Sequence, residues 1–253
     1  MCIRDRFFGI HIKDGIDKIC PDSHLVIQNQ KDIDLFSVRY YGCTDINGYL
    51  DTDWDITNLR GLNPIKTIKG RFNISAFILF NCKGMENLTS VGSLDIFGSN
   101  LESLEGLENL ETIEDDFFLA GSYKIKDFAP LKNLKNVGGG ITILWNEQLE
   151  SLQGLEHINP RDITGLSISG NTQLSDCAIN SFCQYLRLDD AVSNISDNGP
   201  DCTENKIRIA CGDAYIPFAA YYDENRNQQQ DDCLLYTSPS PRDATLSRMP
   251  SSA

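Results

Sequence analysis

The 253-residue sequence predicts a mainly β chain that folds as a β-solenoid with short capping helices. The main observation behind this prediction is a five-residue phrase, Gly-Leu-Glu-Asn-Leu in its fullest form, which occurs five times. The copies span residues 61–65, 84–88, 106–110, 130–134 and 154–158, at steps of 23, 22, 24 and 24 residues. A fixed period in this range is typical of solenoids, in which each repeat buries its apolar side against its neighbours.

A second observation is that each period holds one short strand with alternating apolar residues. The predicted strands cover residues 72–74, 94–96, 117–119, 141–143 and 166–168. Alternate residues of a strand point to the same side, so Leu94 and Ile96 and their equivalents face inward. The phrase lies on the return stretch between strands, where apolar residues recur at every third position. We expect irregular geometry at the bulky Phe117-Phe118 strand and in the repeat that contains Pro130.

Two short helices are expected to cap the repeats. Residues 30–41 place Ile33, Phe36, Val38 and Tyr40 near one side of a helix. Residues 176–186 begin at an aspartate and predict a second helix that closes the other end.

The cysteines gather at the two ends of the repeat array. Cys20 and Cys43 precede the repeats, and Cys177, Cys183, Cys202 and Cys211 follow them. We expect disulfides, because a secreted solenoid needs closed ends and the spacings do not match paired zinc ligands. Cys20–Cys43 is the available pairing at the front. The four later cysteines allow three pairings, among which we favour Cys177–Cys202 with Cys183–Cys211. Cys82 is expected to be a buried free thiol.

The two ends of the chain resemble translated sequencing adapter. Residues 1–6 and 233–253 fit one adapter read in its two directions, although a disordered Ser/Pro-rich tail is an alternative for the second segment. We therefore expect a natural fragment between them, and we draw nothing from the absence of a leader or anchor. The expected organisation is listed by residue range: 1–6 adapter, 7–60 N-terminal region and cap, 61–175 repeats, 176–212 cysteine cap, 213–232 linker or start of another domain, and 233–253 adapter.

The charge of the chain narrows its partners. The formal net charge is −14, and no basic patch is present to replace the counterions of a nucleic acid. The same acidity disfavours an anionic membrane surface, and the sequence has no apolar run of about 18 residues that would span a bilayer.

Residues 27–212 resemble the receptor L-domain type of leucine-rich-repeat protein, in the form found in secreted bacterial surface proteins. The motifs that carry the resemblance are residues 30–36 leading to Gly42 and Cys43, residues 55–62, residues 101–110 repeated at 149–155, and residues 174–212 with their cysteines. The resemblance implies a right-handed solenoid that works outside the cell or on its surface, without catalysis. It does not identify a ligand.

A candidate contact surface lies on the outward strand positions. Phe97, Phe118 and Leu144 fall on consecutive repeats of one face, with Trp145 beside them. Exposed apolar patches mark contact sites, so we expect this face to bind a partner, either a protein or a glycan. The alternative is that these side chains pack under a loop or a neighbouring domain.

Oxygen-bearing side chains near the end of the natural segment suggest calcium. Asp223, Asn225, Asn227 and Asp231 alternate as ligands do in a calcium loop, and the stretch also resembles the start of a B-type repeat of surface adhesins. A solvated polar linker is the alternative. No other cofactor is expected.

No nucleophile motif occurs, so the sequence predicts a non-catalytic recognition or adhesion module rather than an enzyme. The competing class is a polysaccharide-active β-helix enzyme, which needs acidic and basic residues converging on one outward face. In the two outward rows considered, Asp95 stands alone among Ser, Thr, Asn and Phe. A purely structural spacer is a third alternative.

Overall fold

The computed structural model describes residues 20, 21 and 23–212, which are mostly β with few short helices. The strands are β1 (Leu25–Ile27), β2 (Asp45–Ile46), β3 (Leu50–Thr52), β4 (Thr67–Ile74), β5 (Ser90–Phe97), β6 (Thr112–Ile113), β7 (Phe117–Ala120), β8 (Asn136–Val137), β9 (Gly140–Leu144), β10 (Gly165–Ser169) and β11 (Ser193–Ser196). The helices are α1 (Gln30–Asp34), α2 (Phe36–Arg39), α3 (Asn180–Tyr185) and α4 (Glu204–Ala210), with 3-10 turns η1 (Arg60–Leu62) and η2 (Ala129–Leu131). The mainly β prediction is confirmed.

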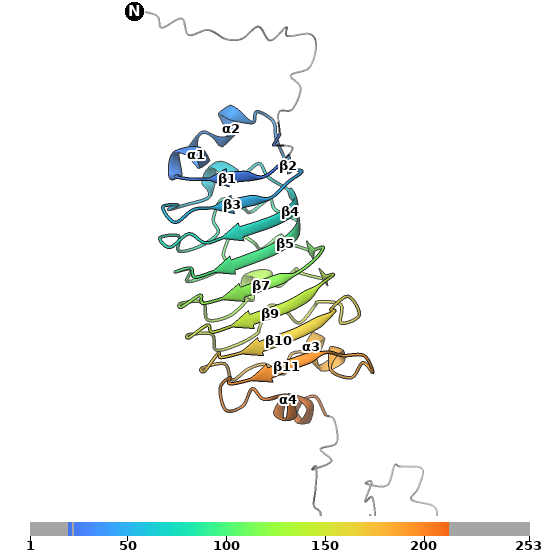
Figure 1. Ribbon diagram of the computed structural model, residues 1–253. Helices are drawn as coiled ribbons and strands as arrows, with labels where there is room; N and C mark the ends of the chain where they lie inside the picture. The colour runs from blue at the N-terminus through green and yellow to red at the C-terminus, as the bar shows by residue number, and fades with distance from the viewer. Residues whose placement is uncertain (1–19, 22, 213–253) are drawn as a thin grey trace, which may run out of the picture. The chain divides into compact units, whose positions relative to one another are not determined.

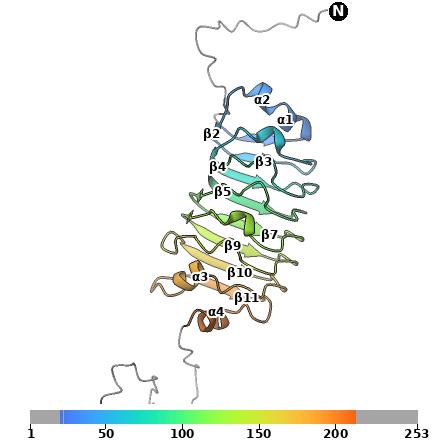
Figure 2. The ribbon, with the colours of Figure 1, turned by 180° about the vertical axis from the view of Figure 1, so that it is seen from behind.

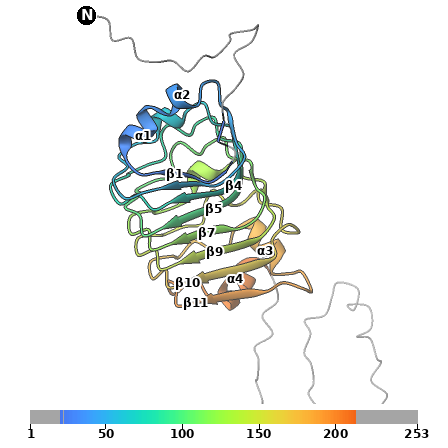
Figure 3. The same ribbon diagram turned by 45° about the horizontal axis from the view of Figure 1, so that its top comes forward.

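Within these residues, every strand pairing is parallel and the strands follow one another in chain order. The order is β1-β3-β4-β5-β7-β9-β10-β11, and Figures 1 and 2 show the strands stacked between α1 and α2 at one end and α4 at the other. Three short strands form a second row of parallel pairs beside this one. β2 pairs with the first residues of β4, and β6 pairs with the first residues of β5 and with β8. Parallel strands need a crossover between them. The five crossovers between β3 and β10 are the return stretches that carry the phrase, one copy each, seen behind the strands in Figure 3.

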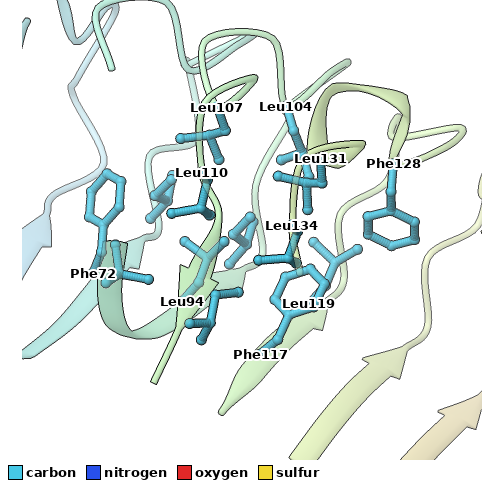
Figure 4. Close-up of a cluster of buried hydrophobic side chains, with 14 of the residues drawn as sticks. Phe72, Leu94, Leu104, Leu107, Leu110, Phe117, Leu119, Phe128, Leu131 and Leu134 are labelled. Atoms are coloured by element: carbon cyan, nitrogen blue, oxygen red, sulfur yellow. The ribbon is translucent and has the colours of Figure 1, made fainter. Parts of the chain in front are cut away.

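The core lies between the strands and the return stretches. In β5, Leu94 and Ile96 are fully buried, whereas Asp95 between them faces outward, as a period of two requires. The return stretch of this repeat contributes buried leucines from the opposite side, namely Leu104, Leu107 and Leu110 (Figure 4). Truncating one such leucine to alanine would cost about 2–5 kcal/mol of folding free energy.

The repeated phrase links neighbouring repeats through its polar and glycine positions. In three copies its glycine has a positive φ, +112° at Gly84, +108° at Gly106 and +111° at Gly154, and a Cβ on Gly106 would lie 2.1 Å from the carbonyl oxygen of Cys82. The glutamate accepts from the glycine of its own phrase, as Glu86 does from the backbone N–H of Gly84 at 2.9 Å. The asparagine donates to the preceding repeat, as Asn109 does to the carbonyl oxygen of Glu86 at 2.7 Å. The phrase therefore has a scaffolding role.

The capping helices are shorter than the sequence predicted. The helix expected over residues 30–41 is divided into α1 and α2 at Leu35, and Val38 is 75% exposed rather than on the buried side. Ile33 and Phe36 are buried and Tyr40 packs against the core, because their spacings of three and four residues fit a helix, whereas the step of two to Val38 does not. The helix expected over residues 176–186 begins only at Asn180. The elements β11 and α4 were not predicted individually.

Three disulfides are present among the described cysteines, in the pairs that the sequence favoured. Cys20–Cys43 ties the first cap, and Cys177–Cys202 and Cys183–Cys211 tie the last. They close loops of 23, 25 and 28 residues, a length for which the chain-entropy model gives about 3 kcal/mol each. Cys82 is a buried free thiol, as predicted.

The prediction of irregular geometry near Phe117 and Pro130 was wrong. Phe117 pairs in register with Leu94 and packs edge-on against Phe128, with ring centroids 5.9 Å apart. Pro130 lies in η2, where the first turn tolerates a missing N–H. The strand register shifts at another place, between Ile68 and Arg71 of β4.

Among the described residues, no helix has the length and apolar character needed to span a membrane.

Candidate recognition surface

The register places three of the four predicted contact residues, Phe97, Phe118 and Leu144, on the outward rows of the sheet, and Trp145 directly follows Leu144 at the end of β9. Phe97 pairs in register with Ala120 and Ala120 with Leu144, while Phe118 lies in the adjacent outward row beside Asp95. Phe97 and Trp145 are 57% and 61% exposed, and Phe118 and Leu144 are half-buried. We call Phe97, Phe118, Leu144 and Trp145 the apolar corner patch. None of these four side chains is buried as a core residue is.

Trp145 has an unusual backbone for a bulky residue. Its φ is +55°, and the matching positions after the neighbouring strands are Gly98, Gly121 and Gly170, all with positive φ. Its N–H donates to the carbonyl oxygen of Ser169 at 3.0 Å, so it is held in line with these glycines. The left-handed region costs a non-glycine residue about 1–2 kcal/mol. The chain therefore places an exposed indole where its neighbouring repeats use glycine.

A column of buried polar side chains holds this corner in place. Ser122 donates its N–H to Oδ1 of Asn146 at 2.9 Å, and Asn146 donates its N–H to Oδ1 of Asn171 at 2.9 Å. The side-chain amide of Asn171 donates in turn to the carbonyl oxygen of Ile143 at 2.9 Å and to Oδ1 of Asn198 at 3.0 Å. Buried polar groups satisfied in this way fix a backbone that would otherwise relax.

Further exposed aromatics, which the sequence analysis did not include, lie on the loops beside the corner patch. Tyr123 is 44% exposed, and its hydroxyl lies 3.9 Å from the position that a Cβ on Gly121 would take. Phe80 is 52% exposed and has the amine of Lys124 5.4 Å from its ring centroid. These residues lie in loops without a period of two, so strand patterning gave no signal for them.

The other half of the same sheet face is polar. Asp95 of β5 faces Arg71 of β4 at 3.6 Å, and Asp51 and Asp116 lie close enough to act on its charge. Burial raises the pKa of the Asp95 carboxyl, Arg71 opposes that shift, and the charges of Asp116 and Asp51 add to it. The expectation that Asp95 stands alone was therefore wrong, because it rested on two rows only. Arg71 and Asp116 lie at the next outward position toward the start of each strand, which those two rows did not include.

Asp51 extends this polar half toward the first strand. Its Oδ2 lies 2.6 Å from Nε2 of His24, and the ring of His24 stands edge-on to Tyr49 with centroids 6.1 Å apart. The Oδ1 of Asp51 is buried without a hydrogen-bond partner. Gly48, Gly70 and Gly92 recur at intervals of 22 residues, just before β3 and within β4 and β5. This spacing is the signal in the sequence that could have pointed to the polar half of the face.

The predicted calcium ligands Asp223, Asn225, Asn227 and Asp231 lie outside the described residues. Within residues 20–212, apart from Asp22, no group of three or more His, Cys, Asp or Glu side chains is arranged to hold a metal ion. Comparison with known proteins adds no relative: no family model, no curated protein and no solved structure matches the chain.

Proposed function

We propose that this chain is a non-catalytic recognition or adhesion module that works outside the cytoplasm, and that its apolar corner patch contacts the partner. The observation that carries the proposal is Trp145, which is 61% exposed in a left-handed conformation. Strained backbone persists where surrounding structure imposes it, and it gathers at functional sites. An indole kept exposed at such a cost is the kind of aromatic anchor that dominates binding energies.

The proposed architecture is a right-handed β-solenoid of the receptor L-domain, leucine-rich-repeat type. Its support is the parallel pairing of successive strands and the phrase whose asparagines bridge one repeat to the next. The extracellular setting is supported by three disulfides, which persist in oxidising compartments. The proposed partner is a protein or a glycan.

The test is a binding screen of the full chain on arrays of extracellular proteins and of glycans. The double variant Phe97→Ser/Phe118→Ser removes the apolar character of the patch, and Val38→Ser is the matched control because Val38 is 75% exposed on α2, away from it. We expect specific hits that the double variant loses and the control keeps, with thermal unfolding unchanged. Partners that bind the double variant as well as the unaltered chain contradict the proposal. If the unaltered chain binds nothing, the alternative of a purely structural spacer is favoured.

The raised pKa of Asp95 favours a second candidate, a polysaccharide-active enzyme. The backbones of Asp51 and Asp95 lie two strand spacings apart in one outward row across Asn73, about 9.6 Å. Inverting glycosidases use two carboxyl groups on either side of the scissile bond, one of them with a raised pKa. Release of reducing sugar from polysaccharides, abolished in Asp95→Asn, would support this candidate. Equal release by both chains would reject it.

A further inference from the structure

We infer that a cleft at the start of the first strands binds a neutral oligosaccharide, at a site separate from the apolar corner patch. The cleft has a volume of about 730 Å³ and is lined by residues from five successive levels of the stack, from Ser23 to Asp115. Ligand pockets have volumes of about 300–1,000 Å³. Its polar and aromatic lining side chains include His24, Asn47, Tyr49, Lys69, Arg71, Ser93 and Asp115.

Two glycines in the lining let neighbouring repeats and the ring of Tyr49 approach the backbone closely. A Cβ on Gly48 would lie 2.1 Å from the carbonyl oxygen of Ser23, and one on Gly70 would lie 2.4 Å from Cδ1 of Tyr49. The register shift of β4, where Lys69 and Gly70 oppose the single residue Gly92, widens the face at this level. These positions cannot be filled without moving the neighbouring repeat.

An aromatic ring is held ready in the cleft. Tyr49 is 52% exposed, the guanidinium carbon of Arg71 lies 5.9 Å from its ring centroid, and His24 packs edge-on against it. His24 is itself fixed by Asp51. A ring already oriented by its neighbours loses little freedom on binding, so it offers an economical stacking surface for the C–H face of a sugar ring.

The hydrogen-bonding groups around this ring suit hydroxyls. The side chains of Asn47, Lys69, Ser93 and Asp115 make no side-chain hydrogen bond or ion pair within the described residues. Together they offer donors and acceptors, and a sugar hydroxyl is both. At and beside the cleft, Asp51, Asp95, Asp115 and Asp116 outnumber Lys69 and Arg71, so an anionic ligand is disfavoured. A neutral, hydroxyl-rich ligand needs no charge of its own to use these donors and acceptors.

The test is calorimetric titration of the full chain with neutral hexasaccharides of cellulose, xylan, amylose and chitin, beside two charged ones, hexagalacturonate and the chitosan hexamer. We expect at least one neutral hexamer to bind with Kd below about 1 mM, and the charged ones more weakly. Tyr49→Ala and Lys69→Ala should each weaken binding at least about tenfold. The matched control Tyr41→Ala should leave it unchanged, because Tyr41 is 55% exposed outside the cleft.

A map on the unaltered protein keeps the test independent of how the variants fold. In backbone amide NMR spectra, the bound hexamer should shift the signals of Gly48, Tyr49, Gly70 and Arg71. Failure of every neutral hexamer to bind, tighter binding of a charged one, or shifts confined to the corner patch would each overturn the inference. Trp145→Gly should retain hexamer binding, so the failure of this inference and of the proposed function are distinguishable.

Discussion

Asn146 and Asn171 are joined through a single oxygen atom: Oδ1 of Asn171 accepts the backbone N–H of Asn146 at 2.9 Å and its side-chain amide at 3.0 Å. Both residues are fully buried. The pair fixes the corner that carries Trp145, because the backbone there has no freedom to move without breaking both bonds. The same column therefore serves the core and the candidate contact surface.

Asn146→Ala should destabilise the protein by about 1–3 kcal/mol, because it leaves the buried N–H of Ser122 without its acceptor, while Oδ1 of Asn171 keeps only the backbone N–H of residue 146. The matched variant Asn109→Ala removes an exposed bond to the carbonyl oxygen of Glu86 and should cost about 0.5–1.5 kcal/mol. Denaturant unfolding of both variants checks the difference. Equal losses would show that the buried column has no special role.

Gly98→Ala and Gly106→Ala should separate backbone strain from steric contact. Both glycines have positive φ, but a Cβ on Gly98 has nothing within 4 Å, whereas one on Gly106 would meet the backbone of Cys82. We expect a loss of about 1 kcal/mol for Gly98→Ala and about 3 kcal/mol or more for Gly106→Ala. Unfolding free energies provide the measurement, and the reverse order would contradict the packing described for the phrase.

Asp95→Asn should raise the free energy of unfolding at pH 7. Folding raises the pKa of the Asp95 carboxyl above its ordinary value of 3.8, mainly through burial, so the folded protein binds this proton more tightly than the unfolded chain. As pH falls from above the raised pKa of the folded protein toward 3.8, Asp95 takes up its proton and the unaltered protein gains stability relative to the variant. The gain of the variant should fade as pH falls and vanish below 3.8. A gain that is independent of pH in thermal unfolding would contradict this assignment.

Cys82 should resist alkylation while the protein is folded. Burial, with a smaller effect of Glu108, raises the pKa of its thiol to about 12. At pH 8 only about one thiol in ten thousand would be ionised, and the thiolate is the nucleophile. Iodoacetamide followed by peptide mass mapping should label Cys82 only after guanidinium is added. Labelling of the native protein would show that this part of the core opens.

The period of the sequence predicted which residues of neighbouring repeats lie in one row and which side chains face the core. Because Phe97, Ala120 and Leu144 are one period apart, their common row followed from the spacing, and so did the inward direction of Leu94 and Ile96. Alternation of side chains needs only the local backbone, which is why the core was predictable. The grouping of cysteines at the two ends predicted Cys20–Cys43, whereas it left three pairings open at the other end, where the favoured one is the one found.

The polar half of the face was missed because the strands were taken as three residues long. In fact β4 and β5 each have eight residues, which brings Arg71 and Ser93 onto the face. The bulge at Lys69 and Gly70 depends on the contact with β5, and a single-strand pattern does not contain it. The left-handed φ of Trp145 was equally hidden, since it is imposed by its neighbours and not by its own preference.

The central claim is that Trp145 is kept for contact and not for folding, and the variant Trp145→Gly tests it most directly. Relief of left-handed strain offsets the packing that the indole loses, so we predict a change in unfolding free energy within about 1 kcal/mol. The same variant should lose the partners that the unaltered chain captures on protein and glycan arrays, apart from saccharides that require Tyr49. A loss of stability of about 2–5 kcal/mol, typical of a truncated core residue, or full retention of those partners would contradict the account.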